Sequence, residues 1–85
     1  MAATHEDVFY EDFYDDYIDC IDDYFRKLEK GARFTTEDMV GQLSSLQSPF
    51  SHNFLYNWVS TEIIKTLYEQ KKIKYMFRGS YVKVK

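Results

Sequence analysis

Residues 51–70, SHNFLYNWVSTEIIKTLYEQ, predict a helix, and residues 71–85, KKIKYMFRGSYVKVK, lead from it directly into a β-hairpin. Ser51 is a favourable N-cap for a helix over residues 52–70, although Ser48 followed by Pro49 would start that helix earlier. Four apolar residues recur at four-residue spacing and predict its buried face: Leu55, Val59, Ile63 and Leu67. On a helical wheel of this segment, Phe54 and Trp58 fall on the outer side of the helix.

The register of the hairpin over residues 73–85 is restricted by parity, because residues opposite one another point to the same face of a sheet. A two-residue turn at Gly79 and Ser80 is predicted, with these cross-strand pairs: Phe77 with Val82 and Tyr75 with Val84. Apolar side chains then share one face with Ile73, and the other face is basic, with Lys74, Arg78, Lys83 and Lys85. A turn at Arg78 and Gly79 keeps the same parity, whereas a three-residue loop would set apolar residues against polar ones.

A long first helix is predicted over residues 5–30, with Thr4 and Asp7 as a capping box and Gly31 as its stop. It has the clearest periodicity in the chain. One arc is apolar and consists of Tyr10, Phe13, Tyr14, Tyr17, Ile18, Ile21, Tyr24, Phe25 and Leu28. The opposite arc is acidic and consists of Glu11, Asp12, Asp15, Asp16, Asp19, Asp22 and Asp23.

A second, shorter helix is predicted over residues 36–45. Thr35 and Asp38 form a capping box, and Phe34 packs on Met39 as a hydrophobic staple. Pro49 disfavours helical angles at the residue before it, which helps to end this segment. Arg33 with Phe34 is predicted to add a short extended stretch before the helix.

Length and composition predict one small α+β domain over residues 1–85, mostly helical, with three helices followed by a C-terminal two-stranded antiparallel hairpin. The single cysteine, Cys20, cannot form an internal disulfide, and no run is long and apolar enough for a membrane span. We therefore expect a cytoplasmic location and no membrane association.

Charge is unevenly distributed along the sequence. Residues 1–25 hold nine acids and no Lys or Arg, and residues 64–85 hold seven bases and one acid.

Residues 32–85 resemble the winged helix-turn-helix superfamily as a pattern, without matching a particular member. The resemblance lies in the capped segment Phe34-Thr35-Thr36-Glu37-Asp38-Met39-Val40, the helix from Ser51, and the passage Leu67-Tyr68-Glu69-Gln70-Lys71-Lys72-Ile73-Lys74-Tyr75 into the hairpin. The chain has Gln70-Lys71 where such domains often place a turn glycine. The resemblance implies a winged helix-like fold, and its members bind DNA, RNA or only protein.

We expect a small regulator that binds duplex DNA through the helix over residues 52–70 and a basic wing. Asparagine can read adenine, hydroxyls and lysines can bind phosphate, and each wing base can neutralise a backbone charge. The expected contact residues are Ser51, His52, Asn53, Asn57, Thr61, Lys65, Lys74, Arg78, Lys83 and Lys85. A basic outer face also has a simpler explanation, since it solvates a hairpin and protects its edge.

The alternative function is a protein interaction module without DNA binding, of which a homodimer is one form. Its surface would be either Phe54 with Trp58 or the acidic face of the first helix, with Asp12, Asp15, Asp16, Asp19 and Asp23. We favour burial of Trp58 by the first helix over an exposed aromatic interface.

Enzymatic activity, a cofactor and a metal site are not expected. Neither His5 nor His52 stands in a recognisable triad, and Cys20 has no evident base beside it. No phosphate-binding glycine loop, zinc-ligand spacing or calcium loop occurs in the sequence.

Overall fold

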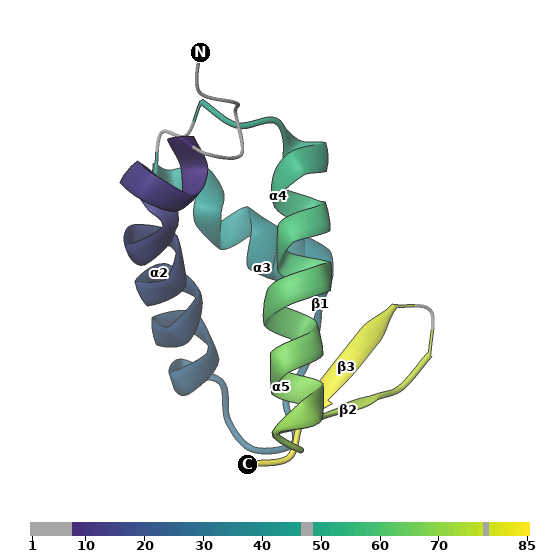
Figure 1. Cartoon of the computed structure of the whole chain (residues 1–85). Coiled ribbons are helices and arrows are strands. Elements are labelled where there is room, and N and C mark those ends of the chain that lie inside the picture. The colour runs from purple at the N-terminus through teal and green to yellow at the C-terminus, as the bar shows by residue number, and fades with distance from the viewer. Residues whose placement is uncertain (1–7, 47–48, 78) are drawn as a thin grey trace.

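The computed structural model describes residues 8–46, 49–77 and 79–85 as three helical segments and a small antiparallel sheet (Figure 1). The first segment joins η1 (Phe9–Phe13) to α2 (Tyr14–Lys27), and the second joins α3 (Thr36–Leu43) to η2 (Ser44–Leu46). The third runs without a break through α4 (His52–Trp58), η3 (Val59–Ile64) and α5 (Lys65–Glu69). The strands are β1 (Arg33–Thr35), β2 (Ile73–Tyr75) and β3 (Ser80–Lys83). The chain is therefore an α+β protein, mostly helical.

Two of the predicted helix starts are confirmed. Ser51 accepts a hydrogen bond of 3.1 Å from the backbone N–H of Phe54, so it caps α4. Thr35 and Asp38 form the predicted capping box at α3 through bonds of 2.9 and 3.1 Å. The predicted Thr4 and Asp7 box and the alternative start at Ser48 lie outside the described residues.

The first helix ends earlier than predicted, because Leu28 already has extended backbone angles and Gly31 lies in the loop after it. Two carbonyls at this end of α2 are bound by a distant side chain. Nζ of Lys83 donates to the carbonyl oxygens of Phe25 and Leu28, each at 2.7 Å, and lies 4.6 Å from the ring centre of Phe25. A cation at a helix C-terminus also complements the helix dipole.

The core is an aromatic cluster between the first and third helical segments. Trp58 is only 4% exposed, and its ring centre lies 4.8 Å from that of Phe9 and 5.9 Å from that of Tyr14. Burial of Trp58 by the first helix is therefore confirmed. Phe9 is fully buried although the predicted apolar arc omitted it, and it belongs to the π-helical turn η1.

The buried face of the third helix departs from the predicted four-residue repeat. Val59 is fully buried, but the next buried residue along this face is Ile64, whereas Ile63 and Leu67 are only half-buried. The π-helical segment η3 explains the change, because its wider turns place residues five apart on one side.

The sheet has three strands in the order β1-β3-β2. The predicted extended stretch at Arg33 and Phe34 is β1, and it pairs with β3. The sheet therefore has one strand more than the two-stranded hairpin that we predicted. The predicted hairpin register is wrong. Tyr75 pairs with Tyr81 and not with Val84, and Val82 pairs with Lys74 and not with Phe77.

A three-residue loop causes the different register. The N–H of Met76 donates to the carbonyl of Ser80 at 2.9 Å, so the hairpin turns between these two residues. Gly79 takes a positive φ of 74°, the left-handed position that such loops commonly require. Lys83 thereby shares a sheet face with Tyr81, Tyr75 and buried Phe34, while Val82 and Lys74 share the outer face.

The third helix ends in a Schellman motif around Lys71. The N–H of Lys72 donates to the carbonyl of Leu67, and the N–H of Lys71 donates to the carbonyl of Tyr68, both at 3.0 Å. Lys71 has a φ of 60°, which glycine adopts far more readily than lysine. A lysine thus occupies the left-handed position of this turn.

Candidate nucleic-acid interface

An exposed stripe of polar side chains runs along the third helix, away from the aromatic core. Asn53, Asn57, Thr61 and Lys65 are all exposed, as we predicted for contact residues. The hydroxyl of Thr61 donates 2.7 Å to the carbonyl of Asn57, and its oxygen lone pairs remain able to accept. The two asparagine amides offer both donors and acceptors, which is the chemistry that reads base edges.

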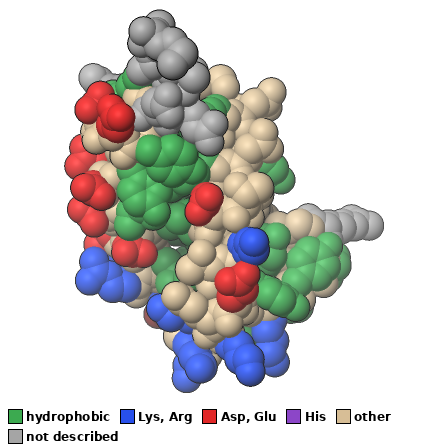
Figure 2. Space-filling model, in the orientation of Figure 1, with side chains coloured by type: hydrophobic (Ala, Val, Ile, Leu, Met, Phe, Trp, Pro, Cys, Tyr) green, Lys and Arg blue, Asp and Glu red, His purple; other side chains and the backbone are tan. Residues whose placement is uncertain are grey.

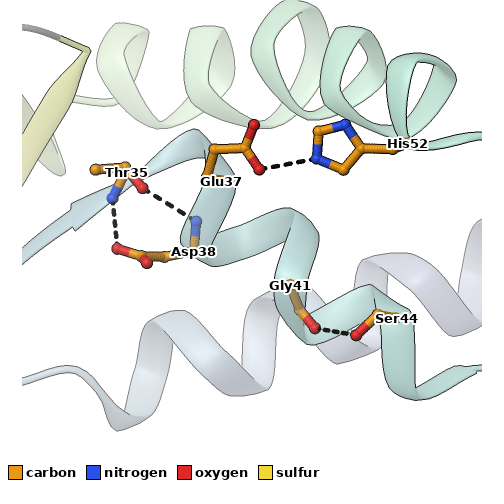
Figure 3. A network of polar contacts seen from close by, with 6 residues as sticks. All are labelled: Thr35, Glu37, Asp38, Gly41, Ser44 and His52. Carbon is orange, nitrogen blue, oxygen red and sulfur yellow. Dashed lines mark hydrogen bonds and ion pairs between the residues drawn. The ribbon is translucent and has the colours of Figure 1, made fainter.

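The start of this stripe is tied to the second helix by a contact between His52 and Glu37, which is an ion pair when the imidazole is protonated. Nε2 of His52 lies 2.8 Å from Oε2 of Glu37, and both side chains are largely exposed (Figure 3). The hydroxyl of Ser51 is already bound by the N–H of Phe54. Ser51 and His52 therefore already have hydrogen-bond partners within the protein. Asn53 is the first predicted contact residue along the helix whose side chain has no hydrogen bond within the described residues.

The hairpin projects beside the lower half of the third helix (Figure 1) and brings part of the predicted basic set with it. Lys74 is exposed on the outer face of the sheet, and Lys85 is exposed beyond β3. Lys83 is half-buried under the sheet with its ammonium group on the end of α2, so it does not lie on the outer face as we predicted. Arg78 lies outside the described residues.

The acidic side chains of the first helix gather at the opposite side of the molecule from the hairpin (Figure 2). All five acids of the alternative interface are exposed: Asp12, Asp15, Asp16, Asp19 and Asp23. Asp23 forms an ion pair of 2.8 Å with Lys27, and this hydrogen bond and the charge of Lys27 lower the pKa of the Asp23 carboxyl. In the described part of the chain, no group of three or more acidic, histidine or cysteine side chains is arranged to hold a metal ion.

The aromatic alternative interface is not a surface in the folded chain. Trp58 is buried, and Phe54 is half-buried with its ring centre 5.1 Å from that of Phe50 and 5.2 Å from that of Phe9.

Cys20 is the single cysteine of the chain. Burial raises the pKa of its thiol, with a smaller contribution from Asp23. A raised pKa is the opposite of what activates a cysteine nucleophile.

A different set of aromatic side chains is exposed, and our sequence analysis missed it. Tyr68 is 58% exposed, Tyr75 is 56% exposed and Phe77 is 57% exposed, all at α5 and the hairpin. The predicted register had placed Tyr75 and Phe77 toward the core. Tyr68 carried one usable signal, because it lies one position beyond Leu67 and therefore off the predicted buried face of the helix.

Comparisons with known proteins gave no match, whether with protein-family models, with curated proteins or with solved structures. Within the residues that the structure describes, no helix is both long enough and apolar enough to cross a membrane.

Proposed function

We propose that this protein is a small winged-helix regulator that binds duplex DNA, with the helix over residues 52–69 in a groove and the hairpin near the phosphate backbone. The order of elements, with a strand after the first helix and a sheet ordered β1-β3-β2, supports the winged-helix assignment. The observation that carries the proposal is the exposed stripe of Asn53, Asn57, Thr61 and Lys65 beside a projecting hairpin.

Charge distribution is compatible with this orientation. The exposed acids of α2 lie at the opposite side of the molecule from the hairpin, so they would be turned away from the phosphates. Of the bases that we predicted to contact DNA, Lys65 on the helix, Lys74 on the hairpin and Lys85 beyond it are exposed in the described part of the chain. Three phosphate contacts give a salt dependence with a slope of roughly −3 in log affinity against log salt.

The test measures binding of labelled mixed-sequence duplex DNA by fluorescence anisotropy at 50 and at 200 mM salt. With three phosphate contacts, the affinity is expected to fall roughly 40-fold as the salt concentration rises from the lower to the higher value. Lys65→Glu is expected to weaken binding and to reduce the salt slope by about 1 or more. Lys27→Glu on the first helix changes the net charge equally and is the matched control, which should bind nearly as the unaltered protein does. Salt-independent or absent binding would overturn the proposal, provided that a pool of randomised duplexes gives the same result.

A further inference from the structure

A groove of about 460 Å³ lies between α5 and the hairpin, and aromatic side chains form both of its walls. Tyr68 comes from α5, while Tyr75 and Tyr81 come from the sheet. Figure 2 shows hydrophobic side chains gathered over the hairpin, next to acidic and basic side chains of the adjacent helix. A groove of this size lies in the range of sites that hold small organic groups.

The ring of Tyr75 is the exposed end of an aromatic row that begins in the core. Ring centres along the row are 6.0 Å apart from Phe25 to Phe34, 5.8 Å from Phe34 to Tyr81, and 5.7 Å from Tyr81 to Tyr75. Exposure rises along this row from 1% at Phe34 to 56% at Tyr75. Tyr81 contacts Tyr75 edge to face, with the two ring planes 72° apart, and more than half of the Tyr75 side chain stays exposed at the groove.

The groove is lined by one base and one acid, and the adjoining hollow adds two lysines. Lys65 lines it directly, and Lys71 and Lys74 line the adjoining hollow on the other side of Tyr68. Glu69 is the one acidic residue lining either hollow among the described residues. Lysine is depleted in the centres of protein interfaces, whereas lysines beside exposed flat rings are typical of sites that bind single-stranded nucleic acid.

We infer that this groove binds an unpaired nucleobase of a strand that continues past the end of a duplex, stacked on Tyr75 and Tyr68. This inference rests on the proposed function. Lys65 belongs both to the exposed stripe of the helix and to the groove, so a strand that leaves the helix face reaches the groove without a gap. Lys65, which lines the groove, would neutralise one of its phosphates.

The experiment compares a blunt duplex with the same duplex carrying a short single-stranded overhang, whose first unpaired base is 2-aminopurine. Stacking of one base on aromatic side chains is expected to tighten binding about tenfold and to reduce the 2-aminopurine fluorescence. Tyr75→Ala should remove the preference for the overhang, and Tyr75→Phe should keep it because the ring remains. Tyr68→Ala provides a second variant on a separate element, and circular dichroism verifies that each variant is folded.

Three outcomes overturn the inference, and they are distinguishable. Equal binding of both DNAs, unchanged by Tyr75→Ala, removes the base-binding groove and leaves duplex binding in place. A preference for the overhang that survives both Tyr75→Ala and Tyr68→Ala places the base elsewhere. Absence of salt-dependent binding to either DNA overturns the proposed function together with this inference.

Discussion

Two lysines near the C-terminal end of the chain have structural roles that their residue type did not suggest. Lys83 binds the end of α2 although it lies 55 positions from Leu28 in sequence. Lys71 occupies a left-handed turn in which a side chain costs about 1–2 kcal/mol relative to a right-handed conformation. A sequence pattern reads both residues as surface cations, because the carbonyls and backbone angles that involve them become visible only in three dimensions.

Lys83→Met is expected to lower the free energy of unfolding by about 2 kcal/mol, because two carbonyls lose a charged donor while the aliphatic stem is retained. Urea denaturation measures the change. Lys85→Met, at an exposed position, should differ from the unaltered protein by less than about 0.5 kcal/mol. Equal effects of the two substitutions would contradict a specific role for Lys83.

Lys71→Gly is expected to raise the free energy of unfolding by about 0.5–1 kcal/mol, since glycine relieves the left-handed strain but loses more chain entropy on folding. The matched control is Lys72→Gly, for which no left-handed angle is recorded and which should be neutral or destabilising. Thermal unfolding followed by circular dichroism compares the two variants. A loss of stability in Lys71→Gly would show that the lysine side chain makes a compensating contact.

Among the elements, those determined by neighbouring residues were predictable and those determined by distant partners were not. The capping box at Thr35 and the cap at Ser51 depend on residues three positions away, and both were predicted. The hairpin register depends on β1, which pairs with β3 across nearly 50 positions. The buried face of the third helix was wrong beyond Val59, because no sequence rule that we applied indicates where a helix widens into π turns.

The same division applies to the candidate site. The exposure of Asn53, Asn57, Thr61 and Lys65 could be predicted because none of them belongs to the apolar face of the helix. The exposure of Tyr75 was not predicted: it shares a sheet face with buried Ile73, as the parity argument placed it, yet 56% of its surface is exposed. The residues of β3 that share this face are Tyr81 and Lys83, in place of the predicted Val82 and Val84.

Gly41 weakens α3 without a steric reason, because a Cβ atom there would meet nothing within 4 Å. Gly41→Ala is therefore expected to raise the free energy of unfolding by about 0.5–1 kcal/mol through helix propensity. Gly79→Ala is the contrasting variant: its position is equally open, but its φ of 74° makes a side chain strained, so stability should fall. Chemical denaturation that showed the same sign for both would refute the assigned backbone conformations.

At the scale of the whole molecule, the aromatic core and the segregated charge divide the surface into distinct regions. The first helix covers the inner side of the third helix and carries most of the acids outward, while the polar stripe and the hairpin remain uncovered. Two buried donors in this core, the hydroxyl of Tyr17 and the indole N–H of Trp58, have no hydrogen-bond partner among the residues that the structure describes.

The chain contains one tryptophan, so its fluorescence reports on this core alone. Because Trp58 is 4% exposed, we expect a blue-shifted emission and weak quenching by acrylamide at low protein concentration. Both properties should change to those of free tryptophan in urea. Emission already typical of solvent in the native protein would contradict the packing of Phe9 and Tyr14 on the indole.

The strand order has a consequence for the assembly of the protein during synthesis. β3 leaves the ribosome after β1 and β2, yet it lies between them in the sheet and its lysine binds the end of the first helix. Until it emerges, β1 and β2 have no neighbour with which to pair, and α2 lacks its terminal cation. The three-stranded sheet can therefore form only after β3 has been synthesised.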